Sequence, residues 1–160
     1  MDIKGKNIII TGGSLGIGKE TTNQLLDKGA NVLVTGRSME RLRNSFSSSK
    51  ANLLLFDIGD IDNINFKADQ CISILENKVD ILINNAGIGV SKPLEDVNYN
   101  DFLEVFNVNV FGLSLFTKKI IPLMKKQKKG KIINIGSTAS LRGYNNGSVY
   151  ASSKFALRCL

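Results

Sequence analysis

Tyr150 and Lys154 stand four positions apart in the stretch YASSK, and Ser137 comes thirteen residues before Tyr150. In a helix, residues four apart share one face, so the tyrosine hydroxyl and the lysine ammonium can approach the same atom. A free tyrosine titrates near ~10, and a neighbouring ammonium favours the phenolate, which suits a general acid or base at neutral pH. Taken alone, the pair is more often an ordinary helix contact, so the rest of the chain must decide between the two.

A glycine-rich turn is the second stretch that could do chemistry. It has the pattern Thr-Gly-x-x-x-Gly-x-Gly, and it joins an apolar run at 7–11 to a predicted helix. Glycines let the backbone turn tightly, and a helix N-terminus offers free N–H groups to a pyrophosphate. A purely structural turn is the alternative, which the spacing and the strand-to-helix context disfavour. The candidate cofactor residues of this turn are Gly12, Ser14, Leu15, Gly16, Ile17 and Gly18.

The elements that must position these residues alternate regularly along the chain. Apolar, β-branched runs predict strands at 7–11, 32–35, 52–56, 79–83 and 131–135. Helical periodicity predicts helices at 16–28, 39–46, 61–76, 100–126 and 152–160. Alternating apolar strands and helices form right-handed βαβ units around a parallel sheet covered on both faces. We therefore predict an α/β protein with a doubly wound parallel sheet. The helix at 100–126 is apolar on most sides, and a subunit interface is one way in which its remaining apolar side chains could be buried.

The absence of histidine limits the chemistry that the chain can perform. It excludes Ser-His and Cys-His catalysis, so acid and base chemistry must come from Tyr, Lys, Asp or Glu. The two cysteines, Cys71 and Cys159, have no paired spacing, and no metal site is expected. We expect both to be buried thiols in helices.

The length and the hydrophobic fraction of the chain are typical of a single domain spanning residues 1–160. The chain has 160 residues, of which 42% are hydrophobic, and no apolar run long enough to span a membrane, so a cytoplasmic protein is expected. The net charge of +7 raises the possibility of a nucleic-acid partner. Its lysines, however, gather between Lys118 and Lys131 at the end of a predicted helix, with no stacking aromatics. A solvated surface without nucleic acid is the favoured interpretation.

Five motifs together resemble the short-chain dehydrogenase/reductase family. They appear in the order and with the spacings of that family, across the whole chain. They are the glycine turn, Asn84-Asn85-Ala86-Gly87, Asn109 within 107–112, Ser137, and the Tyr150/Lys154 pair. The resemblance implies a Rossmann-type sheet and hydride transfer between a nicotinamide cofactor and a small carbonyl or alcohol substrate.

The resemblance also implies catalytic roles for four residues. Tyr150 would protonate the carbonyl oxygen, or accept the proton in the reverse direction, while Ser137 hydrogen-bonds the same oxygen. Lys154 would lower the pKa of Tyr150 and hold the nicotinamide ribose. Asn109 would fix a water that links Lys154 to solvent protons. Judged by its chemistry alone, Asn109 is better read as an amide that caps local backbone groups.

Further cofactor contacts follow from the same resemblance. Asn85, Ala86 and Gly87 would shape the sheet beneath the cofactor, although the segment could also be a plain turn. Asp57 and Ile58 would lie near adenine, although Asp57 could instead cap the helix that follows. The loop 141–146 and Ile88-Gly89-Val90 would border the substrate, where Arg142 could steer an acid or be solvated.

Arg37 favours NADP over NAD as cofactor. In NAD-binding relatives of this fold an acid at the end of the second strand accepts from the ribose 2′-OH, whereas an arginine accommodates the 2′-phosphate of NADP. The second strand here is followed by Gly36, Arg37 and Ser38, with no acid. Arg37 as a solvated helix-start residue is the alternative.

The resemblance also implies an incomplete C-terminal edge. Family members usually continue with two more strands and a substrate-covering segment, so we expect a truncated chain in which the strand 131–135 forms an open edge. Two functions follow. One is an NADP-dependent oxidoreductase, homo-oligomeric when full length. The other is a catalytically inactive nucleotide-binding or interaction protein derived from such an enzyme.

Overall fold

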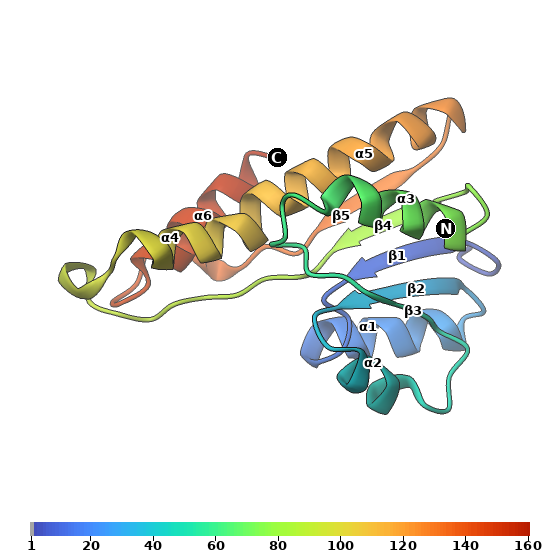
Figure 1. The fold of residues 1–160 in the computed structure, drawn as a ribbon, viewed down its shortest axis with the longest axis horizontal. Helices are drawn as coiled ribbons and strands as arrows, with labels where there is room; N and C mark the ends of the chain where they lie inside the picture. Colours follow the sequence, from blue (N-terminus) through green and yellow to red (C-terminus); the bar gives the residue numbers. More distant parts are fainter. Residues whose placement is uncertain (1) are drawn as a thin grey trace.

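The computed structural model describes residues 2–160 and contains a five-stranded parallel sheet of order β3-β2-β1-β4-β5 (Figure 1). The strands are β1 (Asn7–Thr11), β2 (Asn31–Gly36), β3 (Asn52–Leu55), β4 (Ile81–Asn84) and β5 (Lys131–Asn134). β1 is central and pairs with β2 on one side and with β4 on the other. The predicted fold class is confirmed.

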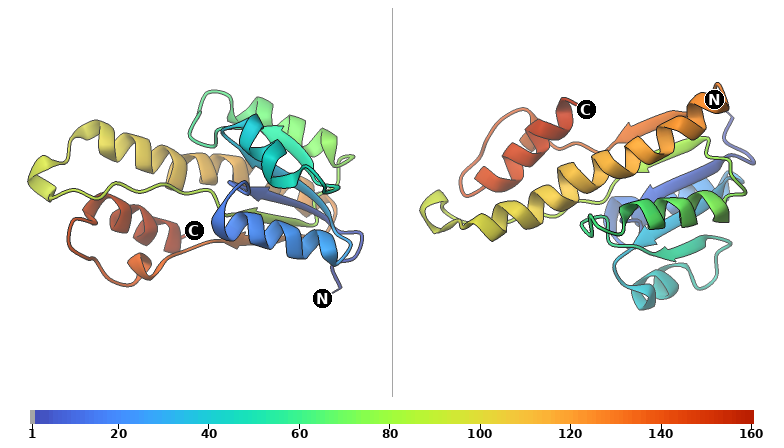
Figure 2. Two further views of the ribbon diagram at one scale, coloured as in Figure 1. Left: turned by 90° about the horizontal axis from the view of Figure 1, so that it is seen from below. Right: turned by 45° about the horizontal axis from the view of Figure 1, so that its top comes forward.

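Helices cover both faces of the sheet (Figures 1 and 2). They are α1 (Gly16–Asp27), α2 (Met39–Phe46), α3 (Ile64–Ile74), α4 (Tyr99–Phe106), α5 (Leu113–Lys126) and α6 (Ser148–Arg158). α1 and α2 pack on one face, and α3 and α5 pack on the other, while α6 lies beside α4. Short 3-10 turns occupy Leu94–Asp96 and Thr138–Ser140. None of the helices within residues 2–160 is both long and apolar enough to cross a bilayer.

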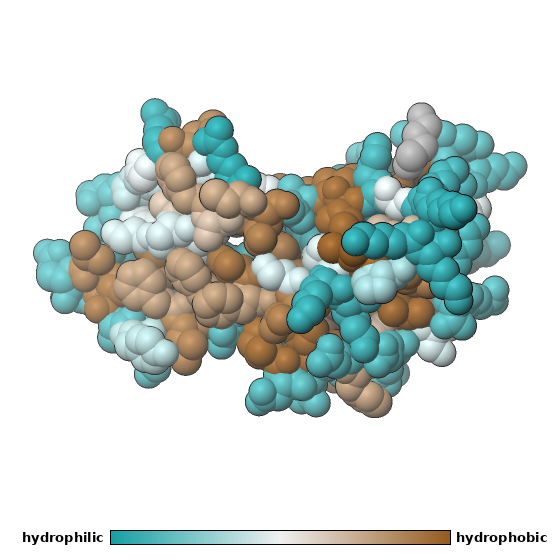
Figure 3. Space-filling view, turned by 90° about the horizontal axis from the view of Figure 1, so that it is seen from above, coloured by the Kyte–Doolittle hydropathy of each residue, from teal (hydrophilic) through white to brown (hydrophobic). Residues whose placement is uncertain are grey.

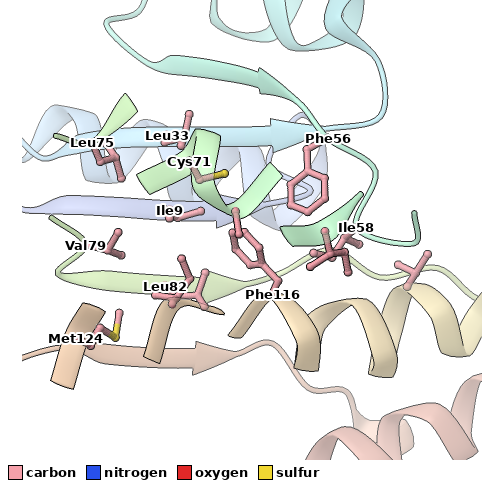
Figure 4. Close-up of a cluster of buried hydrophobic side chains, with 14 residues drawn as sticks. Ile9, Leu33, Phe56, Ile58, Cys71, Leu75, Val79, Leu82, Phe116 and Met124 are labelled. Atoms are coloured by element: carbon pink, nitrogen blue, oxygen red, sulfur yellow. The ribbon is translucent and has the colours of Figure 1, made fainter. Parts of the chain in front are cut away.

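Each face of the sheet has its own hydrophobic core. On the α3/α5 face, Ile9, Leu33 and Leu82 point from the strands toward Phe116, which is fully buried (Figure 4). Phe116 also packs on Phe56, with ring centroids 5.3 Å apart. On the α1/α2 face, alternate residues of the same strands form a second core with helix side chains, among them Leu42 and Phe46 of α2. Burial on both faces explains why the strands are apolar throughout rather than alternating.

The predicted helix at 100–126 is wrong in one respect. A six-residue π-helical segment, η2 (Asn107–Gly112), separates α4 from α5. The apolar pattern does not reveal it, because one extra residue per turn only rotates the helix face. π-helical turns are rare and are frequently found at functional sites. The segment contains Asn109.

Cys159 corrects a second expectation. Cys71 is buried in α3, and burial raises the pKa of its thiol to about 12. Cys159 is exposed, because α6 ends at Arg158 and the following residue leaves the packed helix face. The prediction of two buried thiols therefore holds for Cys71 only.

β5 forms one edge of the sheet, and its side chains are exposed, as predicted. Apolar side chains also gather on the face formed by α4, α5 and α6 (Figure 3). Phe102 and Phe111 are 36% and 47% exposed there, and the ring of each is tilted against that of Phe106, at centroid distances of 6.3 and 6.1 Å. The expected homo-oligomer stays a prediction.

Candidate functional site

The strand order places a site at the carboxyl ends of β1 and β4. The chain proceeds outward from β1 to β3 and then crosses to β4 on the other side of β1. Ligands bind in open α/β sheets at this switch point, outside the carboxyl ends of the strands. Both the glycine turn and the segment Asn85–Gly87 follow strands that end there.

The glycine turn is held by Thr11 and Asn85. The Thr11 hydroxyl accepts hydrogen bonds from the backbone N–H groups of Asn85 (3.2 Å) and Ala86 (3.1 Å). The Asn85 side-chain amide donates to the carbonyls of Thr11 and Gly12, both at 3.0 Å. Gly12 has φ +64°, and a Cβ there would lie 2.7 Å from Ala86 Cα. Thr11 therefore locks the two loops together, a role that its place as the last strand residue did not reveal.

The N-terminus of α1 is suited to an anion. Leu15 precedes the helix in an extended conformation and supplies no side-chain cap, and no acidic residue lies in the first turn. The first N–H groups of a helix have no intrahelical partner, and they carry the positive end of the helix dipole. These groups border the cavity at the switch point.

That cavity has a volume of about 370 Å³ and collects nearly all the predicted cofactor residues. Those lining it are Gly12, Ser14, Leu15, Gly16, Ile17, Gly18, Arg37, Asp57, Ile58, Asn85, Ala86 and Gly87. The structure adds Ile88, which was expected beside the substrate, and six residues that the sequence did not indicate as cofactor contacts: Thr35, Gly36, Ser38, Arg41, Phe56 and Val108. Arg41 could have been found, because it belongs to the first turn of the predicted helix at 39–46, which begins two residues after Arg37. The residues at the strand ends could not have been found, because the side chains that face the cavity depend on how neighbouring strands are paired.

Arg37 and Arg41 give the β2 end of the cavity its charge. Arg37 follows β2 directly, and Arg41 belongs to the first turn of α2. Ser38 caps that helix by accepting a hydrogen bond from the Arg41 N–H at 3.2 Å. Two guanidinium groups at one end of a cavity favour a ligand that carries negative charge there.

Asp57 lines the cavity but does not cap α3, which begins seven residues later at Ile64. One of its carboxylate oxygens accepts a hydrogen bond from the Gly59 N–H at 2.9 Å. The alternative of a helix cap is therefore wrong. The side chain instead stabilises the turn that leaves β3, and it borders the cavity as well.

Asn109 ties the loop after β4 to α6. Its Oδ1 accepts from the Ile88 N–H at 2.9 Å, while its Nδ2 donates to the Ile88 carbonyl at 2.8 Å and to Ser153 Oγ at 2.9 Å. Ser153 in turn donates to the Tyr150 carbonyl at 2.7 Å. Asn109 thus binds backbone groups, but those of Ile88, 21 positions away, instead of the local ones of the alternative, and it fixes Ile88 against the helix that carries Tyr150.

Lys154 is buried, being 4% exposed, and its ammonium donates to the carbonyl of Ile135 at 2.8 Å. Burial lowers the pKa of this amine. A Cβ built on Gly87 would lie 3.4 Å from Asn109 Oδ1 and 3.5 Å from Lys154 Nζ. Because Gly87 lines the cavity, the polar ends of Asn109 and Lys154 lie at the edge of the cavity.

Tyr150 and Lys154 both belong to α6, which begins at Ser148 and so includes Tyr150, unlike the predicted helix at 152–160. Lys154 Nζ lies 5.8 Å from the centre of the Tyr150 ring. Tyr150 lines a second, open hollow of about 400 Å³. Gly87 and Ile88 line both this hollow and the cavity at the switch point, so the two adjoin. The other residues of the hollow are Gly89, Val90, Ser91 and Tyr144.

Ser137, like Asn109 and Lys154, is not among the residues that line the two adjoining hollows. It begins the turn Thr138–Ser140, and its hydroxyl accepts from the Ala139 N–H at 3.1 Å. It lines a different hollow, together with Leu157 and Leu160. Ser137 follows Ile135 by two residues, so it lies near the carbonyl that binds Lys154, although its hydroxyl serves its own turn.

We expect Lys154→Met to remove a pH dependence of stability. The lowered pKa means that the folded chain binds the lysine proton more weakly than the unfolded chain does. Between the folded pKa and the ordinary value of 10.5, the unfolded state therefore holds more protons, and the free energy of unfolding rises with pH. Urea unfolding from pH 7 to 10 should show this rise in the wild type but not in Lys154→Met. Lys126→Met, which replaces an exposed lysine, is the control. Parallel curves for wild type and Lys154→Met would contradict the expectation.

The sequence matches a family model described as short chain dehydrogenase over residues 6–160. An uncharacterized oxidoreductase of Staphylococcus saprophyticus is 30% identical, over 99% of this chain and 65% of its own length. The 3-ketodihydrosphingosine reductase of Bacteroides thetaiotaomicron is 35% identical, over 94% of this chain and 54% of its own length. Human retinol dehydrogenase 8 is 35% identical, over 95% of this chain and 50% of its own length. The chain spans about half to two thirds of the length of these relatives.

Two solved structures have the same fold. A metagenomic short-chain oxidoreductase in complex with NADP has a TM-score of 0.91 and 29% identity, over 99% of this chain and 74% of the other. A short-chain dehydrogenase/reductase from Burkholderia phymatum in complex with NAD has a TM-score of 0.92 and 25% identity, over 99% and 58%. The fold thus accepts both nicotinamide nucleotides.

Proposed function

The chain belongs to the short-chain dehydrogenase family, and we propose that it acts as an NADP-dependent oxidoreductase that interconverts a carbonyl and an alcohol. The observation that carries the proposal is the adjacency of two hollows. The cavity at the switch point has the features of a nucleotide site, and the hollow beside it contains the Tyr150 ring. Gly87 and Ile88 belong to both.

The residues around the cavity fit a nicotinamide dinucleotide. The uncapped N-terminus of α1 suits the diphosphate, and Arg37 and Arg41 suit a phosphate on the adenosine ribose. Asp57 and Ile58 lie where β3 ends, on the adenosine side of the cavity. Lys154, at the edge near Gly87, would hold the nicotinamide ribose. When bound, the cofactor supplies or accepts the hydride.

The protein then needs to supply a proton and to stabilise negative charge on the substrate oxygen. Tyr150 is the proposed acid in reduction and the base in oxidation. Lys154 Nζ lies 5.8 Å from the centre of the Tyr150 ring, and the Ile135 carbonyl fixes its position. Asn109 keeps the loop at Ile88 and the helix of Tyr150 in register. Ser137 Oγ accepts from the Ala139 N–H, which leaves its own hydroxyl hydrogen free to donate to a substrate oxygen.

The hollow at Tyr150 favours an uncharged carbonyl compound. Of the residues 2–160, those lining it carry no formal charge besides the ionisable tyrosines. Arg142 is exposed and is not among them, so the idea that it steers an acid has no structural support. Two relatives are named for 3-ketodihydrosphingosine and for retinol, a ketone and an alcohol.

We expect Arg37→Asp to weaken NADPH binding by roughly 10- to 100-fold and to change NADH binding much less. The introduced carboxylate repels the 2′-phosphate, whereas it can accept a hydrogen bond from the free 2′-OH of NADH. Isothermal titration with each cofactor measures the preference. Arg43→Asp makes the same charge change on an exposed residue of α2 outside the cavity, and it should leave the preference unchanged. An unaltered preference for NADPH in Arg37→Asp would contradict the proposed cofactor specificity.

The second candidate function is an inactive nucleotide-binding or interaction protein. The observation that favours it is that Ser137 lines a different hollow from Tyr150. NADPH binding without turnover of any ketone or aldehyde would support this alternative over the enzyme.

A further inference from the structure

Ser45 makes a long-range contact that the proposed catalytic and cofactor roles do not use. It lies in the last turn of α2, and its hydroxyl donates to the backbone carbonyl of Ser14 at 2.8 Å, across 31 positions of sequence. In the described part of the chain, this is the one side-chain hydrogen bond between α2 and the glycine turn at 12–18.

The contact joins two parts of the cavity. α2 contributes Arg41 at the β2 end, and Ser45 stands four residues later, on the same side of the helix. Ser14 belongs to the turn that precedes α1, where N–H groups are free for an anion. α2 is itself anchored, because its side chains Leu42 and Phe46 are buried in the core.

Fixing the Ser14 carbonyl also fixes a donor. In a trans peptide the C=O and the following N–H point in opposite directions. If the carbonyl is directed toward α2, the Leu15 N–H is directed away from α2, at the N-terminus of α1. Without Ser45, this peptide plane would be free to rotate, and ordering it on binding would cost conformational entropy.

We propose that Ser45 is a positioning residue for the cofactor, and that its hydrogen bond to Ser14 pre-orders the glycine turn for the diphosphate. The proposal rests on the proposed nucleotide function. Because NADPH and NADH share the diphosphate, Ser45 affects both equally. In this it differs from Arg37 and Arg41, which are proposed to distinguish them.

The test is isothermal titration of the 160-residue chain and its Ser45→Ala variant with NADPH and with NADH. Both dissociation constants should rise by the same factor, roughly three- to tenfold, which corresponds to one lost hydrogen bond. Ser45→Thr, which keeps the hydroxyl, should restore wild-type affinity. Where turnover is measurable, kcat at saturating cofactor should not change, whereas the KM for the cofactor should rise.

Ser49→Ala is the matched control, because Ser49 donates only to the nearby Phe46 carbonyl. It should leave both affinities within about twofold of the wild type. Wild-type affinities in Ser45→Ala would overturn the positioning role, and so would a loss confined to NADPH, which would assign Ser45 to the phosphate instead. A wild-type chain that binds neither cofactor would overturn the proposed function itself.

Discussion

Replacing Tyr150 with phenylalanine should reduce NADPH-dependent carbonyl reduction by roughly 10²- to 10⁴-fold, the usual contribution of a positioned general acid. The substitution removes one oxygen atom and keeps the ring. No hydrogen bond to the Tyr150 hydroxyl is seen within residues 2–160, and the bond between Ser153 and Tyr150 uses the backbone carbonyl. The fold and the affinity for NADPH should therefore be retained. Steady-state kinetics with a ketone panel and titration of NADPH measure the two effects separately.

Tyr144→Phe is the matched control for this prediction. Tyr144 lines the same hollow but is half exposed, and it lies outside α6. Its hydroxyl should matter little for kcat. Equal activity of wild type and Tyr150→Phe would remove Tyr150 from the proposed mechanism, and a large loss in Tyr144→Phe alone would move the acid to that residue.

Gly112→Ala should produce the largest loss of stability among single-methyl changes at the glycines near the site. A Cβ at Gly112 would overlap the carbonyl oxygen of Ile58 and would lie 2.7 Å from that of Asn107. Helix propensity alone favours alanine over glycine by about 1 kcal/mol. Overpacking against two rigid backbone groups costs about 1 to 3 kcal/mol, and occasionally more, so the steric effect should exceed the gain in propensity.

Urea unfolding measures this loss, and Gly143→Ala is its control. No atom lies within 4 Å of a Cβ at Gly143, and its φ is not in the left-handed region. It should unfold within about 0.5 kcal/mol of the wild type. Gly112→Ala should also bind NADPH more weakly, because Ile58 lines the cavity. Full stability in Gly112→Ala would show that η2 can move away from the β3 loop.

Most of the fold was predictable because its strands are short apolar runs ended by turn residues. The run at 7–11 corresponds to β1 without change, and the helix at 39–46 is likewise confirmed. The strand predicted at 79–83 begins instead at Ile81, because Asp80 uses its carboxylate to accept the Asn7 N–H at the strand entrance. Such a boundary depends on a partner 73 residues away, which no local pattern contains.

The parts of the site in which a motif fixes the backbone were predictable. The parts in which tertiary packing sets the helix geometry or the exposure of a side chain were not. The glycine turn and Asn85 were identified because their roles require particular residue types at particular spacings. η2 was missed, since an extra residue in a helix turn leaves no signature in hydrophobicity. The exposure of Cys159 was missed for a different reason. Burial and side-chain direction at a turn or a helix end depend on neighbours that the local sequence does not specify.

The central claim is that a hydride passes between nicotinamide and a carbon held beside Tyr150. The most direct measurement is to incubate the 160-residue chain with NADPH that carries deuterium at both positions of the nicotinamide C4 and with a panel of aliphatic and aromatic ketones and aldehydes, and then to determine by mass spectrometry where the deuterium lies. With the wild type we expect deuterium on the carbinol carbon of an alcohol product, and with Tyr150→Phe we expect at least a hundredfold less labelled product. Binding of NADPH with no label in any product, or equal labelling by both proteins, would contradict this claim.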